Sequence, residues 1–187
     1  MGVALVTDST AYLPPQAAAQ LGVHVVPVQV VLDGVSYDEV GGITTPELVA
    51  ALRGGATATT SRPSAAQFEQ IYRGLQETGA TSIVSVHLSG GLSGTWESAT
   101  IAAGRMDIPV TAIDSRQVAM AFGFAVERAA QLAAAGASHD DIVQAVRRDC
   151  ADASILFLVD TLEFLERGGR IGSVKAKVGS ALQVKPI

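Results

Sequence analysis

The run SGGLSG at residues 89–94 has the residue types of an anion-binding loop, with three glycines and two serine hydroxyls. The segment before it, 82–88, alternates in the manner of a short buried strand, and a helix is expected from 95 toward 106. Either Gly94 or Ser93 is placed to cap that helix. The backbone N–H groups of the helix start and the positive end of its dipole would then face the loop. This pattern predicts an anion site.

The loop fits a carboxylate better than a polyphosphate. A P-loop requires a lysine after the final glycine, where this chain has Thr95 and Trp96. The glycine spacing also differs from the dinucleotide fingerprint, and residues 91–95 do not form a G-x-S-x-G nucleophile elbow. The loop therefore offers neutral hydroxyls and amides, which suit a singly charged anion.

The elements that must position this loop indicate an α/β fold with a mainly parallel, doubly wound sheet and flanking helices. Three strands, 3–7, 82–88 and 109–113, each run into a polar turn. Ligands bind such sheets beyond the carboxyl ends of the strands, so these turns are expected at one edge. The hydroxyl-rich segment 57–64 is expected to be a loop that closes over the same place. Further strand character is expected at 23–32 and 35–37, and helices at 16–21, 45–53, 65–77, 117–135 and 138–150.

Two domains are expected within the 187 residues. Residues 1–150 are expected to form an N-terminal α/β domain, and residues 151–187 are expected to begin a second α/β domain that the chain does not complete. This second part is expected to contain a strand at 153–159, a helix at 161–167 closed by Gly168 and Gly169, and a strand beginning at 183–187.

Composition narrows the class of protein. Hydrophobic residues make up 48% of the chain, yet no apolar run approaches the ~18 residues of a membrane span. The net charge of −5 and scattered cations argue against nucleic-acid binding. The single cysteine, Cys150, excludes a disulfide framework within the chain and a zinc cluster, and Asp8 interrupts any signal-peptide core, so a cytoplasmic location is expected.

Five motifs, in this order and spacing, resemble those of the DegV family of bacterial proteins, and the match covers essentially the whole chain. They are Val6-Thr7-Asp8-Ser9-Thr10, Thr60-Ser61-Arg62-Pro63-Ser64, residues 89–95, Ile113-Asp114-Ser115, and Gly168-Gly169-Arg170-Ile171 through Lys185-Pro186-Ile187. The resemblance implies a two-domain α/β protein that buries one long-chain fatty acid. It also implies an acyl-binding subunit that presents the acid to a fatty acid kinase in phospholipid synthesis.

The resemblance also implies roles for individual residues. Thr60 and Ser93 match the hydroxyls that hold the fatty acid carboxylate, and Arg170 is a candidate contact for the kinase. The supporting head-group loops include Asp8, Ser9, Ser61, Arg62 and Gly94. The chain departs from the family pattern at Arg62, where glutamine is usual, at Gly90, where serine is usual, and in lacking the family's histidine-containing carboxyl-terminal motif.

The expected function is binding without catalysis, with a long-chain fatty acid as ligand and no metal, cofactor, nucleic acid or stable membrane insertion. One alternative is a serine hydrolase or acyltransferase that uses Ser93, His87, and Asp8 or Asp114. Another is a nucleotide or phosphosugar module. The two aspartates are also expected to form turns and to hold neighbouring loops through backbone N–H groups.

The helix expected at 117–135 is apolar on nearly every side. Such a helix does not sit on a surface. It is expected either to form one wall of a fatty acid tunnel or to be buried between the sheet and the second domain.

Overall fold

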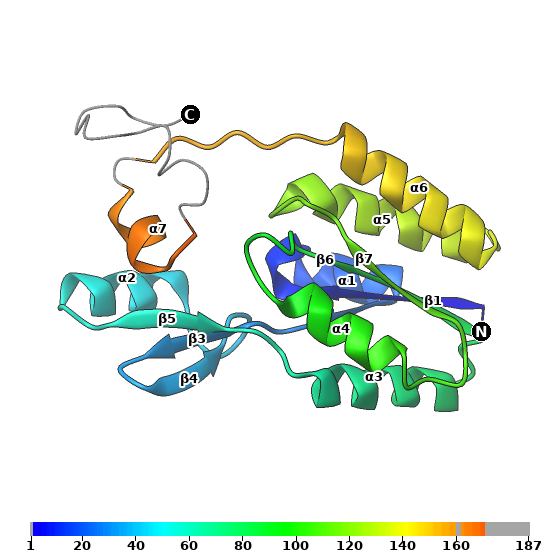
Figure 1. Cartoon of the computed structure of the whole chain (residues 1–187), viewed down its shortest axis with the longest axis horizontal. Coiled ribbons are helices and arrows are strands. Elements are labelled where there is room, and N and C mark those ends of the chain that lie inside the picture. The colour runs from blue at the N-terminus through cyan, green and yellow to red at the C-terminus, as the bar shows by residue number, and fades with distance from the viewer. Residues whose placement is uncertain (1, 160–161, 171–187) are drawn as a thin grey trace. The chain divides into compact units, whose positions relative to one another are not determined.

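The computed structural model describes residues 2–159 and 162–170 (Figure 1). The chain divides into two compact units, Met1–Ala153 and Ser154–Ile187.

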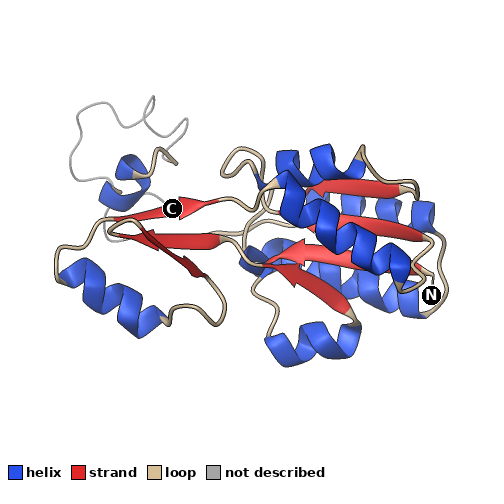
Figure 2. Ribbon diagram, turned by 90° about the horizontal axis from the view of Figure 1, so that it is seen from below, coloured by secondary structure: helices blue, strands red, loops and turns tan. Residues whose placement is uncertain are grey.

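The larger unit is built on a four-stranded parallel sheet (Figure 2). Its strands are β1 (Val3–Asp8), β2 (Val23–Val26), β6 (Ser82–His87) and β7 (Val110–Asp114), in the order β2-β1-β6-β7. Every neighbouring pair is parallel. The expected α/β fold with a parallel sheet is therefore confirmed, and β1 lies inside the sheet with a partner on each side.

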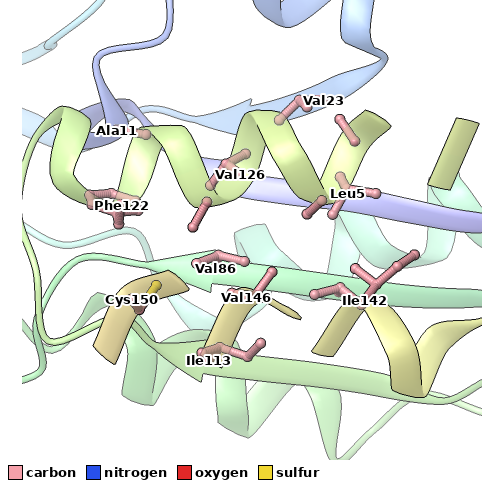
Figure 3. Close-up of a cluster of buried hydrophobic side chains, with 14 of the residues drawn as sticks. Leu5, Ala11, Val23, Val86, Ile113, Phe122, Val126, Ile142, Val146 and Cys150 are labelled. Atoms are coloured by element: carbon pink, nitrogen blue, oxygen red, sulfur yellow. The ribbon is translucent and has the colours of Figure 1, made fainter. Parts of the chain in front are cut away.

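One face of this sheet packs on α5 (Met120–Ala134) and α6 (His139–Asp152), close to α1 (Pro15–Leu21). Strand residues alternate between faces, so every second residue of β1 and β6 faces these helices. Figure 3 shows the resulting cluster, which includes Leu5, Val84, Val86, Ile113, Phe122, Val126, Ile142 and Val146.

The other face packs on α3 (Ala65–Glu77) and α4 (Thr95–Ala103), which also contact each other (Figure 1). Its core contains Val6, Val26, Ile83, Phe68, Tyr72, Leu75, Ala99 and Ala102. Helix α3 begins at a capping box in which Ser64 and Gln67 bond each other's backbone N–H, as the serine in the sequence suggests. Helices thus cover both faces of the sheet.

A second, antiparallel sheet lies between β2 and α3 in the sequence. It contains β3 (Gln29–Leu32), β4 (Val35–Asp38) and β5 (Ala58–Ser61) in the order β4-β3-β5, with α2 (Thr45–Arg53) between β4 and β5. The β3–β4 turn is Asp33-Gly34, with φ of 48° and 86°, as the tight hairpin turn requires. Helix α2 has no buried residue.

Two expectations for this region are wrong. The strand expected over 23–32 is two strands in different sheets, because Pro27, which separates them, has no N–H to donate to a ladder. The segment 57–64, expected to be a loop, contains β5, in which Thr59 pairs with Val31 and Thr60 with Val30. Threonine is β-branched, and here its strand preference outweighs its turn preference.

Helix α5 starts at Met120, three residues later than expected from 117. The intervening residues form a loop in which Arg116 and Ala119 have φ of 55° and 56°. The buried face of α5 packs against the sheet and α6, whereas Phe124 on the same helix is 64% exposed. Helix α4 ends at Ala103 rather than near 106.

Within the second unit, the helix expected at 161–167 is observed as α7 (Glu163–Arg167) over the described residues. Gly169, with φ of 71°, ends it, and the N–H groups of Gly169 and Arg170 donate back to Glu166 and Leu165. The strand expected at 153–159 is wrong, because these residues join neither sheet and Leu156 is 79% exposed. The strand expected at 183–187 lies outside the described residues.

Two helical glycines differ in the space around them, which gives a first test of the packing. A Cβ on Gly123 would lie 2.5 Å from the carbonyl oxygen of Ala11, whereas a Cβ on Gly74 would meet nothing within 4 Å. We expect Gly123→Ala to lower the free energy of unfolding by about 1–3 kcal/mol through overpacking. Gly74→Ala should raise it by about 0.5–1 kcal/mol, because alanine loses less entropy in a helix. Urea unfolding of both variants measures this, and equal effects would contradict the close approach of Ala11 to α5.

Candidate functional site

Three loops meet at the carboxyl ends of the parallel strands. The backbone N–H of Leu88, after β6, donates to Asp8 at the end of β1 at 3.1 Å. In the same way Gly90 N–H donates to Asp114 at the end of β7 at 3.0 Å, and Ser89 N–H donates to the carbonyl of Gln117 at 2.8 Å. The expectation that the polar turns lie at one edge is confirmed, and both aspartates hold a neighbouring loop as expected.

Asp8 is fully buried, and its carboxylate forms four hydrogen bonds. One carboxylate oxygen caps the short 3₁₀ turn η1 (Ser9–Ala11) by accepting from the backbone and side chain of Thr10. The other accepts from Leu88 N–H and from Nδ1 of His87, at 3.0 Å. A buried carboxylate requires such partners, so Asp8 fixes the geometry of two loops at once.

Ser9 is also buried and connects the two sheets of the larger unit. Its hydroxyl accepts from the N–H of Val28, just before β3, at 3.0 Å and donates to Glu39, just after β4, at 2.5 Å. The hydroxyl of Ser9 therefore holds the chain where it passes from one sheet to the other.

Asp114, at the end of β7, holds a neighbouring loop through backbone N–H groups as Asp8 does, but it is less buried. One of its oxygens accepts from the N–H groups of Gly90 and Arg116. A Cβ on Gly90 would lie 3.0 Å from the other oxygen, so the loop approaches the carboxylate closely at this glycine.

Ser93 stands at the start of α4. Its N–H donates to the carbonyl of Ser89, which closes the loop. Its hydroxyl accepts from the N–H of Thr95 at 3.3 Å and shares a hydrogen bond with the Thr95 hydroxyl at 2.9 Å. Gly94 is the N-cap residue and brings no side-chain cap. The expected strand, glycine-rich turn and helix start are therefore all present.

Thr60 and Ser61 are exposed residues of β5, and Arg62 follows them directly. The Arg62 guanidinium donates to the carbonyl of Gly94 at 3.1 Å and pairs with Glu97 at 2.8 Å. A Cβ on Gly94 would lie 1.7 Å from Nη1 of Arg62, so the guanidinium packs directly on the glycine. The segment that carries Thr60 is thereby attached to the loop that carries Ser93.

His87 does not pair with Ser93. Its Nδ1 bonds Asp8, and its Nε2 bonds the hydroxyl of Ser85 at 2.7 Å. The His87–Asp8 pair of the hydrolase alternative is therefore present. Nε2 of His87, however, bonds Ser85, and the hydroxyl of Ser93 bonds Thr95.

Sequence reasoning missed Ser85 and Tyr72, whose hydroxyl donates to Ser85 at 2.8 Å. Strand alternation could have predicted that Ser85 lies beside His87, because residues 85 and 87 share a face of β6.

Arg170 belongs to the second unit, where it is exposed and donates from Nη1 to the carbonyl of Gly168 at 2.6 Å. Cys150 is buried, and burial raises the pKa of its thiol to about 11, which makes the thiol unreactive near neutral pH. Among residues 2–159 and 162–170, no three metal-ligating side chains of the His, Cys, Asp or Glu type come together. No helix in this described part has the length and apolarity needed to cross a bilayer.

Several proteins are similar to this chain in sequence and in fold. Residues 2–187 match the family model described as "Uncharacterised protein, DegV family". A DegV domain-containing protein of Streptomyces coelicolor is 46% identical over 185 residues, which cover 99% of this chain and 66% of that protein. A DegV domain-containing protein of Deinococcus radiodurans is 42% identical over 188 residues, again with 66% of its length covered.

Two solved structures are similar over the whole chain. A DegV family protein from Thermus thermophilus, described by its fatty acid binding, has a TM-score of 0.92 and 41% identity, with 66% of its chain covered. DegV from Bacillus subtilis, described as a fatty acid binding protein, has a TM-score of 0.91 and 35% identity, with 67% covered.

The parallel sheet and its two helical layers thus define an α/β protein, and the loop after β6 is a candidate site at the carboxyl edge of its strands. The chain belongs to the DegV family. It spans about two thirds of the length of the curated relatives it matches.

The two aspartates at this edge predict contrasting effects of the same substitution. Asp8→Asn removes a buried charge and turns an NH₂ group toward existing donors, so we expect a loss of about 3 kcal/mol or more in the free energy of unfolding. Asp114→Asn keeps the one oxygen that accepts both N–H groups and should cost less than about 1 kcal/mol. Chemical denaturation measures both, and similar losses would show that burial of Asp8 does not decide the effect.

Proposed function

We propose that this chain binds a long-chain fatty acid, whose carboxylate is held by the hydroxyls of Thr60 and Ser93. The observation that carries the proposal is the contact of Arg62 with Gly94, because it attaches the segment bearing Thr60 to the loop bearing Ser93. The fatty acid binding described for the DegV proteins of T. thermophilus and B. subtilis supports the same ligand class. Asp8, Ser9, Ser61 and Gly94 support the head-group loops in this proposal.

The head group orients the acid and contributes little to affinity. Removing a carboxylate from water costs several kcal/mol. Hydrogen bonds to a charged group return roughly 1.5–3 kcal/mol each, and a helix N-terminus about 0.3–1 kcal/mol. Two hydroxyls and the start of α4 therefore offset the cost without a large surplus. Arg62 adds a positive charge at this point, and Glu97 partly neutralises it.

Affinity then comes from the acyl tail. Each buried CH₂ contributes about 0.8 kcal/mol, so a chain of about sixteen carbons supplies on the order of 10 kcal/mol before the costs of ordering. In this proposal α5 contributes to the apolar wall, and its exposed Phe124 is available to a ligand or to a further part of the protein.

The protein would act as a carrier and not as the catalyst. It would present the carboxylate at the sheet edge to a fatty acid kinase, which would transfer the terminal phosphoryl group of a nucleoside triphosphate to a carboxylate oxygen. The products are an acyl phosphate and the nucleoside diphosphate. The bond of His87 Nε2 to Ser85, in place of Ser93, favours this carrier role over hydrolysis through Ser93.

Mass spectrometry of an organic extract of the purified full-length protein tests the ligand. We expect one fatty acid of fourteen to eighteen carbons in stoichiometric amount. An empty extract combined with esterase activity that is lost in Ser93→Ala would favour the hydrolase alternative.

The double variant Thr60→Ala with Ser93→Ala tests the assigned hydroxyls. We expect loss of the bound acid, while the free energy of unfolding falls by only about 1 kcal/mol through the lost Ser93 contact at the helix start. The matched control is Thr59→Ala with Ser36→Ala, because Thr59 faces the other side of β5 and Ser36 is an exposed residue of β4. The control should retain the acid. Retention by the Thr60 and Ser93 variant would show that the head-group site is misassigned.

We also propose that Arg170 contacts the kinase. It is exposed and follows the glycine end of α7. Arg170→Ala should lower the rate of acyl phosphate formation by the cognate kinase at least threefold and leave fatty acid binding unchanged. Arg148→Ala, which removes another exposed cation, on α6, serves as the control. Equal rates of acyl phosphate formation for the two variants would show that Arg170 does not contact the kinase.

A further inference from the structure

A buried chain of side-chain hydrogen bonds runs from α3 to the head-group loops. The hydroxyl of Tyr72 donates to Ser85 at 2.8 Å, Ser85 bonds Nε2 of His87 at 2.7 Å, and Nδ1 of His87 bonds Asp8 at 3.0 Å. All four residues have no exposed surface. Such a network is costly unless every donor has an acceptor, so its proton positions are determined by its connections.

These connections select one tautomer of His87. Because the Asp8 carboxylate only accepts, Nδ1 of His87 donates to it, and Nε2 of the neutral imidazole then accepts the hydroxyl hydrogen of Ser85, whose oxygen accepts from Tyr72. Burial raises the pKa of the Tyr72 phenol, which keeps this group a donor. The proton of the neutral imidazole is then on Nδ1 and is donated to Asp8. The ring of Phe68 lies edge-on to the imidazole, with centroids 5.0 Å apart, and restricts its orientation.

The network ends at the backbone of the candidate site. The carboxylate oxygen that accepts from His87 also accepts from the N–H of Leu88, the residue directly before the 89–94 loop. The remaining oxygen is engaged by Thr10. If Nδ1 of His87 ceased to donate, the Asp8 carboxylate would lose the side-chain donor that holds it against Leu88.

We propose that His87, held as the Nδ1–H tautomer by Tyr72 and Ser85, is the positioning residue for the 89–94 loop and through it for the head group of the bound acid. This inference rests on the proposed fatty acid site. His87 does not touch the ligand in this scheme; it acts through Asp8 and the N–H of Leu88.

Three substitutions at position 87 test the proposal in the full-length protein. The amide of His87→Asn places a donor near the Nδ1 position, whereas His87→Gln reaches toward Nε2 and His87→Leu keeps volume but donates nothing. Palmitate affinity is measured by calorimetry, and hydrogen exchange of the Leu88 amide is measured without ligand. We expect His87→Asn to stay within threefold of the wild-type affinity. His87→Leu and His87→Gln should weaken binding at least tenfold and speed exchange at Leu88 at least tenfold.

Ile142→Val is the control for a general loss of stability, because Ile142 is fully buried on α6, outside the network. It should lower Tm without changing either readout. The positioning role would be overturned if the Leu88 amide of His87→Leu exchanged at the wild-type rate. It would also be overturned if His87→Asn and His87→Leu changed that exchange rate equally. If the wild-type protein bound no palmitate, the proposed function would fail, while exchange at Leu88 would still decide whether His87 positions the loop.

Discussion

The carboxylate of Asp8 is the constraint on which this edge of the molecule depends. A charge without exposed surface must be surrounded by donors, and the chain supplies them from η1, from the imidazole of His87 and from the backbone before the 89–94 loop. Satisfying one buried group therefore fixes the ends of β1 and β6 against each other. The parallel register places these ends side by side, and Asp8 determines how the chain leaves them.

The candidate site is held with different strength on its two sides. Toward the parallel sheet, its loops are fixed by buried hydrogen bonds to charged groups, each contributing about 1.5–3 kcal/mol. Toward β5, the attachment is Arg62 with Glu97, whose side chains are 50% and 62% exposed. An exposed ion pair contributes about 0–1 kcal/mol and weakens with salt. The Ser93 side of the site is thus more firmly held than the Thr60 side.

Local signals predicted much of this arrangement. The glycine end of α7 and the turn roles of Asp8 and Asp114 each depend on a few neighbouring residues, and the structure confirms them. The split at Pro27 and the strand β5 were missed, because membership of a sheet depends on a distant partner. Tyr72 was missed for the same reason, since its bond to Ser85 exists only once α3 packs on β6. The carboxylate-binding roles of Thr60 and Ser93 stay predictions.

The interior position of β1 has a consequence for how the chain acquires its structure. During synthesis β1 emerges before the other strands of the parallel sheet, and β2, which follows closely, can pair with one of its sides. The other side pairs with β6, so that Leu5 meets Val84 only after the whole antiparallel sheet and α3 have been made. Contacts of such long sequence separation slow folding, because the entropy of closing the loop is lost before the contact forms. The donors that Asp8 needs from His87 and Leu88 come with the same late strand, so the edge that carries the candidate site is completed at that step.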